Sequence, residues 1–181
     1  MVILETERLI LRELSEADIP LLTPIMSDEE TMRYYPMKFD APYIRKWLSN
    51  SMNSYRVHGF GRWGVIVKET GTFIGDCGIT YHDIEGDSLP ELGYRLYRLY
   101  WRQGYGSEAA RAIRDWAFQN TELPALYSFM MAENAASAAT AEANGMKCIR
   151  KYMDKINGYT YLYAITREEW ETLMAQQDGT K

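Results

Sequence analysis

The segment WRQGYGSEAARAIRDWAF, residues 101–118, restricts the possible folds more than any other part of the chain. It follows an alternating strand pattern, Glu91 to about Tyr97, and places two glycines directly before an amphipathic run. Apolar residues recur in that run at helical spacing, which predicts a helix from Ser107 to about Phe118. A strand, a glycine turn and a helix in succession indicate a layered fold in which something approaches the bare backbone of the turn.

The patterns on either side of this segment complete the fold class. Before it, a strand over 9–14 and two helices lead to a pair of strands, RWGVIV and TFIGDCGITY. After it come a strand, a helix rich in small residues, a strand hairpin around Asn157-Gly158 and a last helix. A hairpin-rich first half thus joins a second half of alternating strands and helices. This order predicts a mixed α/β sheet with helices on both faces.

The length of 181 residues fits a single domain with a substantial core. Thr166 and Glu169 form a capping box that predicts the start of the last helix. The polar residues after that helix carry no apolar pattern. We therefore expect one domain over 1–175 and a frayed tail over 176–181.

The charge and cysteine content argue against several functional classes. The chain has 20 Lys and Arg against 25 Asp and Glu, and it lacks the basic face of a dedicated nucleic-acid binder. Cys77 and Cys148 lie far apart without metal-ligand spacing, so neither a metal site nor a disulfide framework is expected. There is no secretory segment and no apolar run of about 20 residues. We expect a soluble, cytoplasmic protein that binds neither membrane nor nucleic acid.

The two glycines indicate what approaches the turn. A helix N-terminus carries unpaired N–H groups and about half a positive charge, so it attracts anions. Gly104 and Gly106 would let the backbone bend and approach a phosphate without an intervening Cβ, and Arg102 adds a cation. These features indicate a pyrophosphate cradle. A strand-to-helix turn that merely uses glycine is the alternative.

A second alternative is a dinucleotide-binding site. The letters GYGSEA satisfy G-x-G-x-x-A, and Glu133 follows the next strand where a ribose-binding acid could lie. However, the strand before the glycines alternates apolar with charged residues, whereas a doubly wound sheet needs a buried, continuously apolar strand. Too few residues follow Glu133 for a second mononucleotide-binding half, and they contain a hairpin. The sequence therefore argues against a dehydrogenase.

Motifs spread over nearly the whole chain point to one family: TERLILREL, W-x-V at 63–65, FIG at 73–75, ELGYRL, YWRQGYGSEA, and N-x-x-S…E-A-N-G-M at 134–146. Together they make the chain resemble the GNAT superfamily of N-acetyltransferases, and most of all its RimJ/RimL-type branch, which acetylates protein N-termini. The resemblance implies the acyl-CoA N-acyltransferase fold, a splayed, mostly antiparallel sheet of about 6–7 strands with helices on both faces.

The same resemblance implies acetyl-coenzyme A as co-substrate, with no metal, and assigns residues to it. The pyrophosphate would lie on the backbone amides of Gln103, Gly104, Tyr105, Gly106 and Ser107, with Arg102 nearby. The strand before the turn would hydrogen-bond the pantetheine arm through the backbone around Tyr94 to Leu96. Asn134 matches the family asparagine that contacts the cofactor arm near the start of the later helix.

Two positions depart from the superfamily pattern. Trp101 stands where many members have Gln or Arg, and the RimJ/RimL-type branch commonly has Trp there. Ala141 stands where many relatives carry a tyrosine that protonates the departing thiolate. That role is vacant, and Ser137 in N-x-x-S is the substitute that the branch suggests. A serine early in a helix also often bonds its own backbone, which is the alternative for Ser137.

Glu91 is the candidate general base, because ELGY places a carboxylate on the strand that leads to the turn. Its spacing from Leu96 is one residue short of that in histone-type relatives. A slip of one residue turns a side chain to the other face unless a bulge restores it. A rim acid paired with an arginine is therefore the alternative for Glu91. Asp76 is a second acid, better explained as a strand-end residue, and His58 and His82 indicate neither a metal nor a dyad.

We therefore expect an N-acetyltransferase that moves an acetyl group from acetyl-coenzyme A to a primary amine by direct attack in a ternary complex. The acceptor would be a protein N-terminus or a small-molecule amine, and the residues do not choose between them. The family also allows a homodimer. A catalytically silent acyl-coenzyme A-binding module is the alternative, because the family tyrosine is missing and the register of Glu91 is open.

Overall fold

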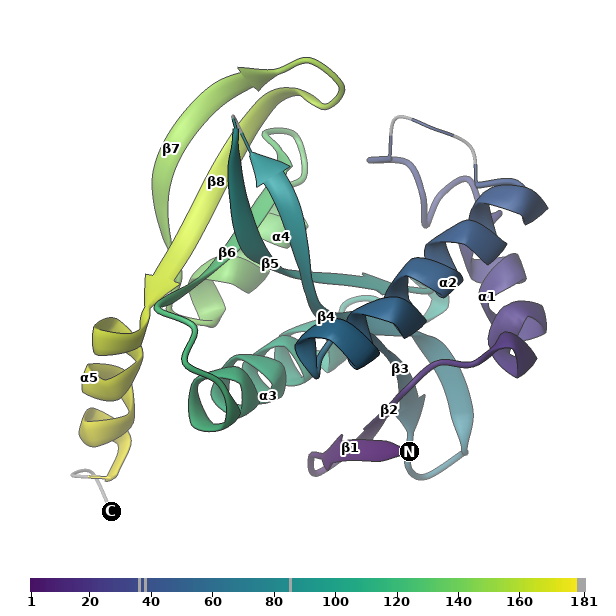
Figure 1. Cartoon of the computed structure of the whole chain (residues 1–181), viewed down its shortest axis with the longest axis horizontal. Coiled ribbons are helices and arrows are strands. Elements are labelled where there is room, and N and C mark those ends of the chain that lie inside the picture. Colours follow the sequence, from purple (N-terminus) through teal and green to yellow (C-terminus); the bar gives the residue numbers. More distant parts are fainter. Residues whose placement is uncertain (36, 38, 85, 179–181) are drawn as a thin grey trace.

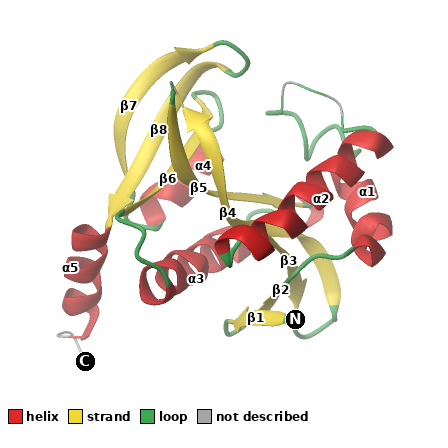
Figure 2. Ribbon diagram, in the orientation of Figure 1, coloured by secondary structure: helices red, strands yellow, loops and turns green. Residues whose placement is uncertain are grey.

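The computed structural model describes residues 1–35, 37, 39–84 and 86–178, and these residues form one eight-stranded sheet with helices on both faces (Figures 1 and 2). The strands are β1 (Val2–Glu5), β2 (Leu9–Arg12), β3 (Arg62–Val67), β4 (Thr72–Ile84), β5 (Asp87–Leu96), β6 (Ala125–Met131), β7 (Lys147–Asp154) and β8 (Gly158–Thr166). The helices are α1 (Ile19–Met26), α2 (Ala41–His58), α3 (Tyr105–Asn120), α4 (Ala135–Ala143) and α5 (Arg167–Asp178), with short 3₁₀ segments η1 (Glu16–Asp18) and η2 (Arg98–Tyr100).

The sheet has the order β1-β2-β3-β4-β5-β6-β8-β7, and all neighbouring strands are antiparallel except β5 and β6. The strands β5 and β6 are parallel, and the described register between them consists of Glu91 with Tyr127. Beyond that pair the strands part, so the sheet divides into a β1–β5 half and a β6–β8 half (Figure 1). We call the region between residues 92–96 of β5 and 128–131 of β6 the split.

Two separate cores hold the helices on the sheet. Helix α3 packs against β4 and β5, and its buried small residues Ala109 and Ala117 belong to the same core as Ile79 of β4 and Leu92 of β5. The second core lies around α1 and α2 and consists of the buried residues Leu14, Leu22, Met26, Met32, Phe39, Ile44 and Leu48. Because α3 packs against β4 and β5, its first turn is fixed beside the end of β5, where the split is open.

The predicted elements are present, with shifted ends. Helix α3 begins at Tyr105 rather than Ser107, because Gly104 adopts the left-handed conformation (φ 82°) and starts the helix in place of a serine cap. The strand expected over 9–14 ends at Arg12. Helix α5 continues to Asp178, so the chain is still helical where the frayed tail was expected to begin, and residues 179–181 lie outside the described part.

Strand β1 was not predicted. It pairs with β2 at the edge of the sheet, with Glu5 opposite Ile10, and it raises the sheet to eight strands from the expected 6–7. Its residues VILE are too few to show a period by themselves. Within the described residues, no helix is both long and apolar enough to cross a bilayer.

Candidate functional site

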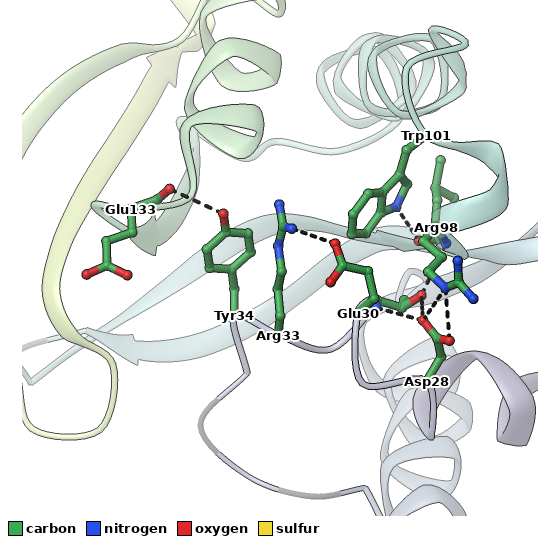
Figure 3. Close-up of polar contacts among 9 residues, drawn as sticks. Asp28, Glu30, Arg33, Tyr34, Arg98, Trp101 and Glu133 are labelled. Atoms are coloured by element: carbon green, nitrogen blue, oxygen red, sulfur yellow. Dashed lines mark hydrogen bonds and ion pairs between the residues drawn. The ribbon is translucent and has the colours of Figure 1, made fainter.

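The main chain of β5 directs polar groups into the split. The amide of Tyr97 donates to the carbonyl of Ile74 on β4, and the β4–β5 register runs without a shift. In an antiparallel pair, hydrogen-bonded residues alternate with residues whose N–H and C=O groups point away from the partner. Tyr97 is bonded to β4, so Leu96 and Tyr94, which lie one and three positions before it, direct their main-chain groups away from β4 and toward the split. The indole Nε1 of Trp101 donates to the carbonyl of Leu96 (2.7 Å; Figure 3), which agrees with this direction.

The turn after β5 presents main-chain donors at the open end of the split. Arg102 and Gly104 both have left-handed backbone, with φ of 59° and 82°. For a non-glycine residue such as Arg102 this conformation costs about 1–2 kcal/mol. The first intrahelical bond of α3 runs from the amide of Glu108 to the carbonyl of Gly104 (3.0 Å). The helical amides that precede this bond, and that a helix N-terminus leaves open to a ligand, are those of Tyr105, Gly106 and Ser107.

Glycine at position 106 is not required by the protein's own atoms. A Cβ added there would meet Leu96 Cδ1 at 3.7 Å, which is an ordinary van der Waals contact. Unlike Gly104, Gly106 is not among the residues with positive φ. The position therefore has room for a methyl group, and the glycine matters only if another molecule lies against the first turn of α3.

Arg8 anchors the turn from the β1–β2 side. Its Nη1 donates to the carbonyl of Gln103 (2.9 Å), its Nε donates to Glu108 Oε2 (2.6 Å), and its guanidinium lies 4.6 Å from the centroid of the Tyr105 ring. Thr6 Oγ1 donates to the other oxygen of Glu108 (2.5 Å). Burial opposes the charged carboxylate, but the hydrogen bonds from Thr6 and Arg8 lower the pKa of Glu108. Sequence reasoning missed this anchor, because no local pattern connects Arg8 with a turn that lies 95 residues later.

The start of α4 is linked to β5 by side chains. Asn134 caps α4, since its Oδ1 accepts from the amide of Ser137 (3.2 Å). The hydroxyl of Tyr94 lies 3.0 Å from Ser137 Oγ and 3.1 Å from the Ser137 carbonyl. The hydroxyl of Ser137 thus bonds a side chain from β5, so the alternative that it merely bonds its own backbone does not describe it. Tyr94 and Ser137 form one hydroxyl pair beside the split.

The Tyr94 hydroxyl is held in its protonated form. Burial raises the pKa of Tyr94 to about 12, against a smaller opposing effect of its hydrogen bond with Ser137. Ala141, the position where relatives carry a tyrosine, is buried in the core under α4. The hydroxyl that pairs with Ser137 therefore belongs to a tyrosine on β5, and sequence analysis had considered only the backbone of that residue.

The segment 28–35 after α1, which we call the strap, reaches both sides of the split (Figure 3). At one end, Arg98 Nε donates to Asp28 Oδ2 (3.1 Å), which fixes the strap to the segment after β5. At the other end, the hydroxyl of Tyr34 donates to the carbonyl of Glu133 at the β6–α4 junction (3.3 Å). The strap therefore joins the end of β5 to the residue before Asn134.

Glu91 lies at the closed end of the split, where β5 and β6 still pair. Because no bulge interrupts the β4–β5 register, Glu91 faces the same side of the sheet as Arg95, which packs on the ring of Trp47 from α2 (4.7 Å). Tyr94 projects from the opposite face, since side chains alternate along a strand. Glu91 Oε2 lies 3.2 Å from His82 Nε2. Sequence analysis expected no partner for His82; the two residues come together because β4 and β5 pair in a register that the sequence does not display.

Asp76 holds two buried arginines on that face. Its side chain is fully buried, with Arg62 Nε at 2.8 Å from Oδ1 and Arg95 Nη2 at 2.7 Å from Oδ2. Burial opposes the charge of Arg62, but the neighbouring Asp76 raises the pKa of the guanidinium above its ordinary value. Asp76 is therefore a structural counter-ion and not a second base, and it is not the simple strand-end residue that its flanking glycines indicated. Glu91 also lies beside Arg62: the two side chains share the space over Gly93, and the Glu91 charge helps to raise the pKa of the Arg62 guanidinium, so the alternative of an acid paired with an arginine stays open.

The structure thus gathers the candidate residues around the split. Its open end has the turn with Arg102 and residues 103–107, its β5 wall has the main chain of Tyr94 and Leu96, and its closed end has Glu91. Asn134 and Ser137 begin α4. Among the described residues, no group of three or more His, Cys, Asp or Glu is arranged to hold a metal ion.

Residues 8–147 match the family described as acetyltransferase (GNAT) domain. The protein YkkB of Bacillus subtilis (strain 168) is 33% identical over 160 residues, which cover 86% of this chain and 93% of YkkB. The crystal structure of an acetyltransferase from Agrobacterium tumefaciens str. C58 is 32% identical with a TM-score of 0.77, covering 90% of this chain and 92% of that chain. RimL, a ribosomal L7/L12 α-N-protein acetyltransferase solved with coenzyme A, has a TM-score of 0.75 at 16% identity over 92% of this chain and 98% of its own, a likeness of fold alone.

Proposed function

Because this chain belongs to the acetyltransferase (GNAT) family, we propose that it transfers an acetyl group from acetyl-coenzyme A to a primary amine by direct attack in a ternary complex. The observation that carries the proposal is the turn of residues 104–107, whose main-chain donors stand at the open end of the split. A diphosphate is the part of coenzyme A that such a helix N-terminus binds best.

The residues present fit this co-substrate along its length. The amides of residues 103–107 would hold the diphosphate, with Arg102 as a nearby cation, and the room over Gly106 lets a ligand come close to the backbone. The main-chain groups of Tyr94 and Leu96 would bind an extended arm as a neighbouring strand does. Asn134 borders the split at the start of α4, where its amide can reach the same arm.

Bound acetyl-coenzyme A supplies an activated acetyl thioester. Glu91 would take a proton from the attacking amine at the closed end of the split, an effect typically worth about 10²–10⁴-fold in rate. Ser137, paired with the protonated Tyr94, would donate to the sulfur as it leaves. Holding the amine and the thioester together contributes more, up to about 7–11 kcal/mol in well-oriented reactions. Binding geometry is therefore the larger part of catalysis.

The cysteines favour direct attack over an acyl-enzyme. Cys77 is fully buried, and burial raises the pKa of its thiol to about 12, so its thiolate form is suppressed. Cys148 is exposed on β7, an edge strand that β6 and β8 separate from the split. Neither cysteine is therefore suited to carry the acetyl group.

The acceptor we propose is a protein N-terminus or a small-molecule amine, as in the RimJ/RimL-type branch that the sequence resembles. An α-amino group has a pKa of about 7.7–8.0 and is partly neutral at physiological pH, whereas a lysine near 10.4 needs more help from a base. Trp101 and the Asn134–Ser137 motif support that branch. RimL acts on ribosomal protein L7/L12, so the N-terminal peptide of that protein is one acceptor to test.

The test is turnover with acetyl-coenzyme A and a panel of acceptors: ribosomal-protein N-terminal peptides, free amino acids, polyamines and aminoglycosides. Release of free thiol that depends on the acceptor, with a product heavier by one acetyl group, is the expected result. Coenzyme A binding without turnover of any amine would instead favour the silent binding module. Unchanged turnover in Glu91→Gln and Ser137→Ala would remove these two residues from the mechanism.

A further inference from the structure

Glu91 and His82 form a pair whose members differ sharply in access to solvent. The Glu91 side chain is 11% exposed, whereas that of His82 is 46% exposed. The 3.2 Å contact between Glu91 Oε2 and His82 Nε2 connects the two. A base that takes a proton in every turnover must also release it, and the more exposed imidazole lies next to this carboxylate. Histidine suits the task because it changes charge near neutral pH.

The His82 ring is held at the closed end of the split. It lies edge to face against Phe129 of β6, with ring centroids 5.4 Å apart and an interplanar angle of 69°. Phe129 is two residues beyond Tyr127, the partner of Glu91, and so faces the same side of the sheet. Three strands, β4, β5 and β6, therefore fix the geometry of the pair where an acceptor amine would enter.

We propose that His82 is the proton exit of Glu91 during acetyl transfer, an inference that rests on the function proposed above. As the amine nitrogen bonds to the acetyl carbon, one of its N–H bonds breaks and Glu91 gains an O–H bond. The C–S bond of the thioester breaks, and coenzyme A leaves as a thiol with a proton that the Ser137–Tyr94 pair donates and then regains from water. The O–H bond of Glu91 then breaks, and Nε2 of His82 gains the proton to give an imidazolium. The half-exposed imidazolium gives one proton to water, which returns the pair to its starting state. His82 acts through Glu91 and is a positioning and relay residue.

A purely structural ion pair would behave differently. Loss of a pair that only stabilises the fold would lower the melting temperature and leave the rate of acetyl transfer by the folded protein unchanged. A relay, in contrast, can be replaced by a free imidazole that occupies the space left by a truncated side chain. Rescue by imidazole therefore separates the two roles.

The experiment compares wild type, His82→Ala, His82→Gln and Glu91→Gln with an acceptor that the wild type acetylates. We expect kcat of both His82 variants to fall roughly 100-fold, the lower end for loss of a proton-transfer group, with KM for acetyl-coenzyme A unchanged. Added imidazole should restore His82→Ala, but neither His82→Gln, whose side chain fills the space, nor Glu91→Gln. His58→Ala is the matched control, because His58 is exposed at the end of α2 and should keep wild-type kcat.

A readout without turnover tests the contact itself. The chain has two histidines, so the imidazole nitrogen signals of His82 and His58 are separable by NMR. Glu91→Gln should shift the His82 Nε2 signal and leave His58 in place; an unmoved His82 signal overturns the pairing. Wild-type kcat in both His82 variants, or a loss that imidazole does not restore, overturns the proton exit while acetyl transfer by the wild type stands. A wild type without turnover contradicts the proposed function instead.

Discussion

The substitution Gly106→Ala separates the needs of the fold from the needs of the ligand. Against the protein's own atoms the new methyl group meets Leu96 Cδ1 at 3.7 Å, so it fits without displacement. Gly106 lies in the first turn of α3 and lacks a positive φ, so alanine suits its backbone. Alanine is also the better helix former by about 0.8–1 kcal/mol in a helix interior. The free chain should therefore become slightly more stable.

The same methyl group should weaken coenzyme A binding. It would stand over Leu96, where the turn meets the split, and would hold a diphosphate away from the amides of residues 105–107. A hydrogen bond to a charged group contributes about 1.5–3 kcal/mol. Loss of one such bond makes the dissociation constant roughly 10–150-fold larger, since each 1.4 kcal/mol is a factor of ten.

The assay pairs thermal unfolding of the free chain with calorimetric titration of coenzyme A. A gain of up to about 1 kcal/mol raises the melting temperature by about 2–4 °C in a chain of this size. Gly59→Ala is the matched control: Gly59 has φ of 76° with nothing near its missing Cβ. Backbone strain should lower the free energy of unfolding of that variant by about 1–2 kcal/mol, and the variant should bind coenzyme A as the wild type does.

Wild-type affinity in Gly106→Ala would refute the assignment of the turn as the diphosphate site. A melting temperature lowered as far as in the Gly59 variant would instead show that the helix does not begin as described. Either result can be read from the same two measurements.

Three further predictions concern the surroundings of the site. Tyr94→Phe should lower kcat more than it weakens coenzyme A binding. Because the two hydroxyls act as one pair, the double variant with Ser137→Ala should have a kcat close to that of the more impaired single variant. Steady-state kinetics of the two single variants and the double variant checks this. Asp76→Asn should lower the free energy of unfolding, measured with urea, by about 3–5 kcal/mol, because it leaves Arg62 and Arg95 buried without this counter-ion. An unchanged free energy of unfolding would contradict that role. Because the pKa of Glu108 is lowered in the folded chain, the Glu108 carboxylate stabilises the fold fully above the ordinary glutamate pKa of about 4.3 and loses this effect as the pH falls below it. In Glu108→Gln, the melting temperature should therefore fall less steeply as the solution is made acidic.

The sequence predicts those parts of the fold that local patterns determine. The strand pair β3–β4, the strand β5 and the hairpin β7–β8 follow from alternation and turn residues, and the box of Thr166 and Glu169 is formed as expected. Gly145 has φ of 80° just after α4, the conformation that a glycine commonly adopts past the end of a helix. The start of α3 was placed two residues late, because Ser107 resembles a cap residue whereas Gly104 starts the helix.

The contacts that shape the candidate site are not local, and this is why the sequence could not show them. Tyr94 meets Ser137 from 43 residues away, and Arg8 reaches Gln103 from 95 residues away. His82 meets Glu91 only because β4 and β5 pair in one particular register. Residue type and spacing along the chain carry no information about such pairings, so the turn was predictable, but its anchor and the partners of Glu91 and Ser137 were not.

The central claim is that main-chain donors at the start of α3 bind a diphosphate and thereby direct an activated acetyl group into the split. A crystal structure with coenzyme A tests it most directly. The expected result has diphosphate oxygens within hydrogen-bond distance of the main-chain nitrogens of residues 103–107 and the arm lying along Tyr94 and Leu96. Coenzyme A seated elsewhere, with this turn unoccupied, would contradict the whole account.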